Sequence, residues 1–471
     1  MSSAGISFGG LASGLDTQAI ISALVAVEQR PIFQLEQKKS TLSKQKSLFG
    51  DLDGLLDTLT NKAKALKTTS GFLQMTASSD DESVVTASAS STATPGTYSV
   101  AVKSLATAQV NTAGQASPSA TIQSGTASLQ IDVGGSSYFV SVQDPSLDSI
   151  AAAINAENEA NEIGVRAEVI DTGNTTDPSQ RYQLVVRAEE TGVDGAFSVS
   201  VDDGNAAFTA LIDELSTTQT VAASNAELVV NGVTLQRSSN TISDLFAGIT
   251  LEVKSVSEEL SPGPPPTYAQ TSVTVATDGE ETSTKVKEFV DAYNAVVDFM
   301  LEQNKVDEEG TASGPLFGDT TLRSIRSSLR GIVGGSVNTT GNEAFQLLSQ
   351  IGIKADTQGK LTFTQSEFEE ALAEDEDAVT ALFTDTTNGI AARLETQIDL
   401  YTDSVDGLLK TRSDGYDRRI KDTNNRIDAA ERRLELYEQQ LTVKYANLET
   451  LLTRLQGQGS SIGNISQAFG G

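Results

Sequence analysis

The side chains that carry out most enzymatic chemistry are missing from this sequence, whose 471 residues include no histidine and no cysteine. Nucleophile pairs of the Ser-His-Asp and Cys-His kinds are therefore excluded, because the base or the thiol is absent. Structural zinc, iron–sulfur and histidine-ligated haem sites are excluded for the same reason. Carboxylates remain, since 63 Asp and Glu residues could act in pairs, as in glycosidases, or bind Ca²⁺ or Mg²⁺. Aromatic residues make up only 5% of the chain and tryptophan is absent, which leaves little to form a substrate pocket.

Three short segments could bind an ion or a phosphate, and each has a simpler interpretation. The run Glu374-Asp-Glu-Asp377 could hold a cation, but a run of like charges is usually a solvated helix face. The segment 171–177 is rich in Asp and Gly like a Ca²⁺ loop, yet its third residue is Gly173 and its twelfth is Tyr182, so a turn fits better. The glycine-rich stretch 9–14 lacks the Gly-Lys-Ser/Thr ending of a phosphate loop. We therefore predict no catalytic, metal-binding or cofactor-binding residue and no enzymatic activity.

The acidic charge of the chain makes nucleic acids and anionic membranes poor partners. Lys and Arg number 33 and Asp and Glu 63, which gives a formal net charge of −30. Such a chain is a poor ligand for nucleic-acid phosphates and is repelled by anionic membranes. Residues 68–409 hold the excess acid, with 15 basic and 49 acidic side chains. No run of 18 apolar residues is present, and the N-terminus lacks the basic and apolar regions of a secretory signal peptide, so neither membrane insertion nor cleavage is expected.

The N-terminal region, residues 17–67, has the apolar spacing of a long helix. Its heptad a positions are apolar and its d positions change from polar to apolar along the helix: Leu35, Leu42, Phe49, Leu56 and Ala63 at a, and Lys38, Gln45, Leu52, Leu59 and Leu66 at d. Ser13 or Asp16 can cap the start by accepting a backbone N–H. Pro31 lacks an N–H and clashes with the preceding turn, which predicts a kink or a new helix start there.

The C-terminal region carries the sharper heptad pattern. Its a positions form an unbroken series: Ile420, Ile427, Leu434, Leu441, Leu448 and Leu455. A sustained period of seven predicts a left-handed supercoil with a partner helix, because the apolar seam cannot be buried alone. The period leaves open whether the partner is another segment of this chain or another copy. Past Gln456 the sequence becomes rich in Gly and Ser, and fraying is expected.

The middle of the chain has the alternating pattern of strands. Strands are predicted at 98–102, 129–133, 138–142, 165–170, 182–187, 197–201, 226–230, 234–236 and 250–256. One short helix is predicted at 147–158, and helix returns after Thr282. The prolines at 262–266 predict a stiff, extended break. The expected fold class is α+β and multidomain, with a terminal helical coiled-coil base, a helical bundle and inserted β-rich domains.

Several motifs, in this order along nearly the whole chain, resemble the flagellar hook-associated protein 2 family. The opening Gly10-Leu-Ala-Ser-Gly-Leu-Asp-Thr17 is one of them. The others are 231–232 with 239–251, Lys287-Glu-Phe-Val-Asp-Ala-Tyr-Asn294, Gly314-Pro-Leu-Phe-Gly-Asp319 and 351–361. The block 129–201 resembles the flagellin IN module through Val133-Gly-Gly135, Ala153-Ile-Asn155 and Glu190-Thr-Gly192.

The resemblance implies a structural cap at the tip of the bacterial flagellar filament, outside the cell, which promotes polymerisation of exported flagellin. It implies a homo-oligomeric ring as the working form. The other implied partners are flagellin, the hook–filament junction proteins, and the flagellar type III export apparatus with its chaperone. The expected domains are terminal assembly segments that are partly disordered (1–40 and 430–471), a helical bundle (41–71 and 282–429), a β-rich domain (72–111 and 225–281) and an inserted IN-like domain (112–224).

The heptad seams are the predicted assembly interface. Its residues are Leu35, Leu42, Phe49, Leu52, Leu56, Leu59, Leu66, Ile420, Ile427, Leu434, Leu441, Leu448 and Leu455. Two other functions are weighed against the cap: an enzyme using paired carboxylates, and a surface adhesin acting through the acidic outer β domains.

Overall fold

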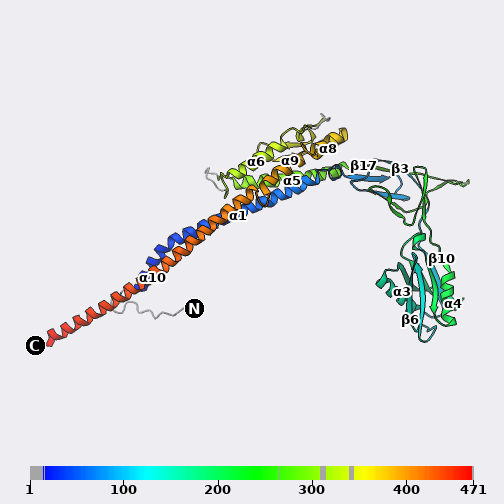
Figure 1. Ribbon diagram of the computed structural model, residues 1–471, viewed down its shortest axis with the longest axis horizontal. Helices are drawn as coiled ribbons and strands as arrows, with labels where there is room; N and C mark the ends of the chain where they lie inside the picture. The colour runs from blue at the N-terminus through cyan, green and yellow to red at the C-terminus, as the bar shows by residue number, and fades with distance from the viewer. Residues whose placement is uncertain (1–13, 15, 264, 308–313, 339–343, 469–471) are drawn as a thin grey trace. The chain divides into compact units, whose positions relative to one another are not determined.

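The computed structural model describes residues 14, 16–263, 265–307, 314–338 and 344–468, the side chains of 460–468 excepted. The chain divides into two compact units (Figure 1). The helical unit comprises residues up to 72 and from 283 onward, and the β unit comprises residues 73–282. Among the described residues, none of the helices is long and apolar enough to cross a membrane.

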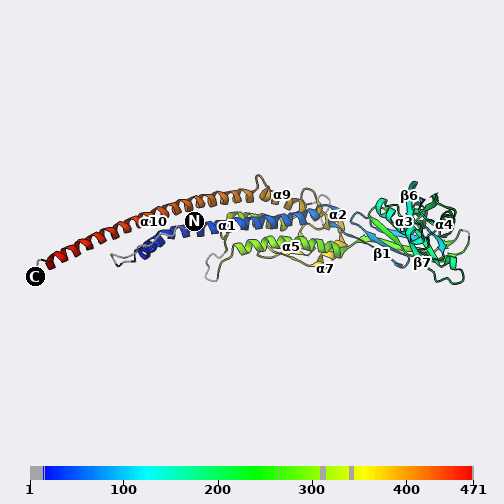
Figure 2. The same ribbon diagram turned by 90° about the horizontal axis from the view of Figure 1, so that it is seen from below.

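The helical unit is built on two long helices, α1 (Thr17–Ala65) and α10 (Leu408–Ala468), which lie side by side (Figures 1 and 2). The remaining elements pack near one end of this pair: α2 (Thr69–Phe72), α5 (Gly279–Gln303), α6 (Thr320–Val333), η3 (Leu348–Ile351), β18 (Ile353–Ala355), β19 (Leu361–Phe363), α7 (Gln365–Glu374), α8 (Glu376–Thr384) and α9 (Ile390–Thr402). Their core contains an aromatic cluster in which the Phe72 ring stacks on Phe383 at 5.0 Å and meets Phe368 edge-on at 6.3 Å.

Three sequence expectations about the long helices can be compared with the structure. Asp16 caps α1, since its carboxylate accepts the Ala19 N–H at 2.9 Å. The helix then runs unbroken through Pro31, so a new helix start there is wrong. Pro31 is exposed, and water can bond the carbonyl that its missing N–H leaves without a helical donor. The fraying expected past Gln456 is also wrong, because α10 continues to Ala468. Glycine weakens a helix by roughly 1 kcal/mol but does not end it.

One part of the β unit is a pair of antiparallel sheets around one core. The first has the strand order β1 (Met75–Ser79), β17 (Thr271–Thr277), β3 (Gly96–Ser104), β11 (Ala226–Val230) and β12 (Val233–Arg237). The second has the order β13 (Thr241–Phe246), β14 (Ile249–Val253) and β2 (Val85–Ala89). Alternating apolar residues such as Val100, Val102 and Leu228 fill the space between them. Asn231 and Gly232 have positive φ angles of 49° and 82°, which suit the tight turn between β11 and β12.

The other part of the β unit, residues 110–221, has its own core, formed by two sheets and two helices. One sheet has the order β10 (Gln219–Val221), β4 (Val110–Gln115), β8 (Tyr182–Ala188) and β7 (Val165–Asp171); the other has β6 (Ser136–Gln143), β5 (Thr126–Val133) and β9 (Phe197–Asp203). Helices α3 (Leu147–Asn161) and α4 (Ala206–Thr217) flank these strands (Figure 1), with two short turns at Pro178–Gln180 and Val193–Gly195. The helix predicted at 147–158 and the strands predicted here are confirmed, whereas α4 was not predicted.

The proline-rich segment is not an extended break. Strands β15 (Glu259–Ser261) and β16 (Thr267–Tyr268) pair antiparallel on its two sides, with Glu259 opposite Tyr268. The chain therefore reverses direction there, and Pro262, Pro265 and Pro266 lie in the connection of a hairpin, where a missing N–H costs no ladder bond. Pro264 lies outside the described residues.

Candidate assembly interface

Helices α1 and α10 pack antiparallel along a shared seam. The rings of Phe49 and Tyr416 lie 5.7 Å apart, and Lys46 forms an ion pair with Asp417 at 2.6 Å. Further along, Leu35 and Ala430 line the same hollow. Because the two helices are antiparallel and have the same rise per residue, positions that increase along α1 lie opposite positions that decrease along α10. In this register Thr17, the first residue of α1, lies beside the region of Leu448 on α10.

The predicted interface residues of α1, with Leu66 directly after its end, face inward. Leu35 is half-buried, and the remaining six are at most 3% exposed: Leu42, Phe49, Leu52, Leu56, Leu59 and Leu66. Helix α1 packs against α9 as well as α10, so these side chains have partners within the protomer.

The predicted interface residues of α10 fall into two groups. Ile427 and Leu441 are 7% and 8% exposed and Ile420 and Leu434 are half-buried, and we call residues 420–441 the paired segment. Leu448 and Leu455 are 41% and 53% exposed. The apolar seam thus continues past the residues that α1 covers.

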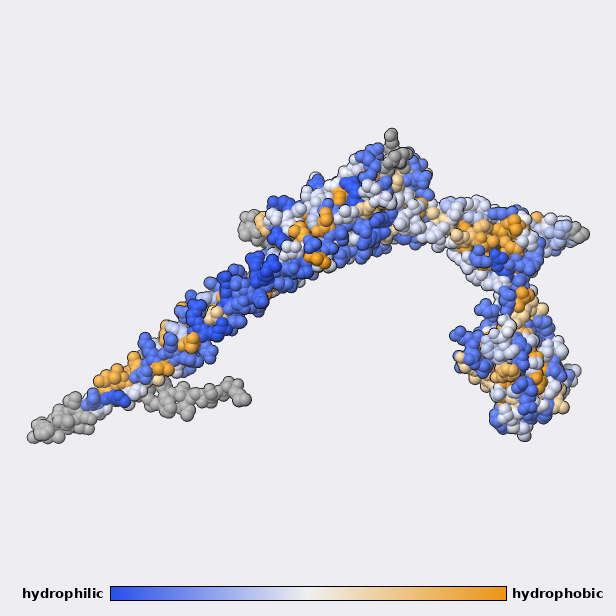
Figure 3. Space-filling view, viewed as in Figure 1, coloured by the Kyte–Doolittle hydropathy of each residue, from blue (hydrophilic) through white to orange (hydrophobic). Residues whose placement is uncertain are grey.

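We call residues 448–459 the overhang. It also exposes Leu451, at 58%, while Leu452 is half-buried. Figure 3 shows hydrophobic residues gathered on this end of α10. Leu451 was not among the predicted interface residues, although its heptad d position was a signal that could have placed it there. Three exposed leucines on one helical stripe form a surface suited to another apolar helix.

Polar contacts beside the seam add little to its stability. The side chains of Lys46 and Asp417 are 38% and 53% exposed, and exposed ion pairs contribute about 0–1 kcal/mol. Burial raises the pKa of Tyr416, and the nearby Asp319 carboxylate raises it further. The seam between α1 and α10 is therefore held mainly by apolar contacts, and the Tyr416 phenol lies on it just before the paired segment.

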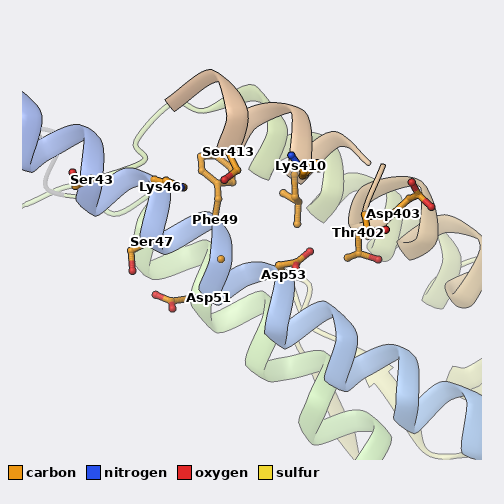
Figure 4. A pocket seen from close by; sticks show the side chains of 13 residues that line it. Ser43, Lys46, Ser47, Phe49, Asp51, Asp53, Thr402, Asp403, Lys410 and Ser413 are labelled. Carbon is orange, nitrogen blue, oxygen red and sulfur yellow. The ribbon is translucent and has the colours of Figure 1, made fainter. Parts of the chain in front are cut away.

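A hollow of about 660 Å³ opens between α1 and the α9–α10 junction (Figure 4). Hydroxyl groups, two lysines and the carboxylates of Asp51, Asp53 and Asp403 line it, with Phe49 and Leu409 as its apolar part. Burial raises the pKa of Asp53, and Asp57 adds to the effect. Within the described ranges, no three residues of the His, Cys, Asp and Glu types are placed to hold a metal ion. The two lysines of the hollow pair with carboxylates outside its lining, Lys46 with Asp417 and Lys410 with Asp414.

Two family models match the chain, one before and one after residues 110–222. Residues 13–109 match "Flagellar hook-associated protein 2 N-terminus", and residues 223–457 match "Flagellar hook-associated protein 2 C-terminus". Together the two matches take in well over half of the sequence, including α1 and most of α10.

Individual proteins are similar over almost the whole length. Flagellar hook-associated protein 2 of Escherichia coli strain K12 is 28% identical, over 97% of this chain and 97% of that protein. The B-type protein of Pseudomonas aeruginosa is 26% identical, over 98% and 97%. The crystal structure of the D1-D2-D3 domains of the flagellar cap protein FliD from Escherichia coli superposes with a TM-score of 0.62 and 28% identity, over 79% of this chain and 99% of that one. From both family matches and this agreement in fold, the chain belongs to the flagellar hook-associated protein 2 family.

Proposed function

We propose that copies of this chain assemble into the cap at the tip of the bacterial flagellar filament and promote polymerisation of exported flagellin beneath it. Membership of the family supports this role, and the similar Escherichia coli structure is that of a flagellar cap protein. None of the relatives named above is described as an adhesin. The role is structural and requires no catalysis, in keeping with a sequence that lacks His and Cys.

The observation that carries the assembly step is the exposed overhang of α10. Full burial of a leucine side chain stabilises by about 1.5–3 kcal/mol. Leu448, Leu451 and Leu455 are 41–58% exposed, so a second copy that covered them would gain the remaining part of that burial. In this proposal the paired segment holds the protomer together and the overhang joins one protomer to the next.

The exposed leucines of the overhang are also relevant to the proposed export chaperone. Before assembly, an exposed leucine stripe is an aggregation hazard, which an export chaperone would remove by covering it. Export through the flagellar type III apparatus requires an unfolded chain, and a chain without disulfides meets that requirement. The exported protein then acts outside the cell, at the filament tip, after the hook–filament junction proteins are in place.

The test replaces Leu448 and Leu455 by Asp in the full chain, produced in a flagellated strain that lacks its own cap protein. We expect flagellin to leak into the medium while the circular dichroism and melting temperature of the purified variant stay those of the wild type. Leu436→Asp with Val443→Asp is the matched control, because these two residues of α10 are also exposed, at 59% and 60%, but lie off the seam. Normal filaments from the Leu448/Leu455 variant would contradict the proposal.

A further inference from the structure

The first turns of α6 and α10 enclose a groove of about 640 Å³, which we call the arginine groove. Its lining residues are Thr320, Thr321, Ser324, Leu408, Thr411, Arg412, Gly415, Tyr416, Arg418 and Arg419. Every charged side chain among them is an arginine, and four of the others are hydroxyl-bearing Thr or Ser. The groove is therefore rich in hydrogen-bond donors and contains no carboxylate in its lining.

The three arginines differ in how far they are already engaged. Arg412 donates to the Thr321 hydroxyl at 2.9 Å and lies 3.7 Å from the Asp319 carboxylate. Arg419 lies over the Tyr416 ring, 5.6 Å from its centroid, which positions the guanidinium without using its donors. Arg418 and Arg419 are exposed, and neither makes a direct salt bridge with a described residue, although the charge of Arg418 helps to lower the pKa of the nearby Asp414 carboxyl.

A donor-rich groove whose exposed guanidinium groups make no direct salt bridge can recognise carboxylates, because the planar fork of arginine matches the two oxygens. The groove is an exception in a chain of net charge −30. A second copy of this chain carries about twice as many acidic as basic side chains, 63 against 33. It is therefore an electrostatically suitable partner for the positively charged groove.

One acidic segment of the same unit is placed to be that occupant. The longest acidic run of the sequence, Glu374-Asp-Glu-Asp377, spans the junction of α7 and α8 and is not the helix face expected from the sequence. Asp375 turns the chain there by capping α8, with its carboxylate accepting the Ala378 N–H at 2.8 Å. Glu374 and Asp377 are exposed, and neither is ion-paired with any described residue. We call this junction the acidic corner.

Within one protomer the acidic corner and the arginine groove lie apart. The corner opens α8, whose Phe383 stacks on Phe72 just beyond the end of α1. The groove contains Tyr416, which packs on Phe49. From position 49 to the end of α1 at position 65 is about 24 Å of helix. The two surfaces are thus different patches on one unit, as a head-to-tail contact between copies requires.

We propose that the arginine groove of one copy receives the acidic corner of its neighbour, so that Arg418 and Arg419 bind Glu374 and Asp377 across a heterologous interface of the ring. The inference rests on the proposed assembly into a cap and adds a second contact to that made by the overhang. Repeated around the ring, the contact fixes the direction in which protomers follow one another.

The test is a charge-swap series in the full chain, produced in a strain without its own cap protein. Arg418→Glu with Arg419→Glu, or Glu374→Lys with Asp377→Lys, should each increase leaked flagellin, since two attractive contacts become repulsive and association weakens about tenfold, which corresponds to about 1.4 kcal/mol. Combining all four substitutions should restore capping. Lys44→Glu with Arg432→Glu is the control, because it makes the same change in net charge at exposed positions outside the groove.

Each other outcome rejects the inference in a recognisable way. Leakage from the arginine variant without leakage from the acidic variant, or without rescue by the combination, means that the groove binds an acidic partner other than this corner, such as flagellin. Wild-type capping by both reversed variants means that the groove is not an interface. Failure of the wild-type chain itself to cap filaments would instead reject the proposed function, so the two failures are distinguishable.

Discussion

The paired segment and the overhang are parts of one helix with one sequence pattern, yet their surroundings differ. Residues 420–441 place their a positions against α1, where Ile427 and Leu441 are almost fully buried. Residues 448–459 continue the same heptads, but Leu448, Leu451 and Leu455 remain largely exposed. The difference lies in the length of the partner helix, because α1 begins at Thr17, beside the region of Leu448.

This comparison separates two uses of an apolar seam. Where a seam is buried within the protomer, its leucines contribute to folding and are unavailable to another chain. Where the seam extends beyond the end of α1, exposed leucines contribute to stability only after another chain has covered them. Heptad periodicity alone therefore predicts that a partner exists and not which chain supplies it.

The largest expected effect comes from placing charges in the paired segment. Ile427→Asp with Leu441→Asp should lower the free energy of unfolding by several kcal/mol, because an unpaired carboxylate is buried at each position. Thermal melting followed by circular dichroism measures the loss, and Leu448→Asp with Leu455→Asp provides the comparison. Equal loss of stability in the two variants would contradict the conclusion that the paired segment contributes to folding and the overhang does not.

Thiol labelling should distinguish the same two regions without adding a charge. The chain has no cysteine, so a single introduced thiol reports one position. In the free protein, Leu451→Cys should react at least about tenfold faster than Leu441→Cys, because labelling a buried position requires local opening. On assembly the Leu451→Cys thiol should become protected. Rapid labelling that persists in assembled caps would show that the overhang is not covered by another copy.

Much of the fold was predictable from local pattern. Alternation predicted strands such as β5 and β6, since Leu129, Ile131, Val140 and Val142 all point into one core. Helix α4 was missed although Phe208, Leu211, Ile212 and Leu215 have helical spacing, because the segment is short and lies among strands. Strand β13 was missed because Ile242, Leu245 and Phe246 do not alternate.

The candidate interfaces were less predictable, for a physical reason. Whether Leu441 or Leu448 is covered depends on the register between two helices that are far apart in sequence, since α1 ends at Ala65 and α10 begins at Leu408, and no local pattern encodes that register. The arginine groove likewise joins Thr320 and Arg418, which are brought together only by the packing of α6 near α10. Sequence pattern identifies apolar and charged faces, and tertiary packing decides which of them remain open.

The smallest expected effect is a pH dependence confined to the inner end of the seam. Burial, and then Asp319, raise the pKa of Tyr416 in the folded chain, while Arg419 and Arg412 act in the opposite direction. The folded state therefore favours the neutral phenol. The resulting contribution to the free energy of unfolding is fully present below the unfolded pKa of about 10, and it is lost as the pH rises through the folded pKa.

Tyr416→Phe keeps the ring against Phe49 but cannot ionise. The difference in unfolding free energy between wild type and this variant should be constant from about pH 7 to 9 and shift toward the variant above about pH 10, as measured by urea titration at each pH. A difference that does not change with pH would mean that the phenol is as well solvated in the folded chain as in the unfolded one. The seam between α1 and α10 would then be open to water at Tyr416, as the overhang is at Leu451.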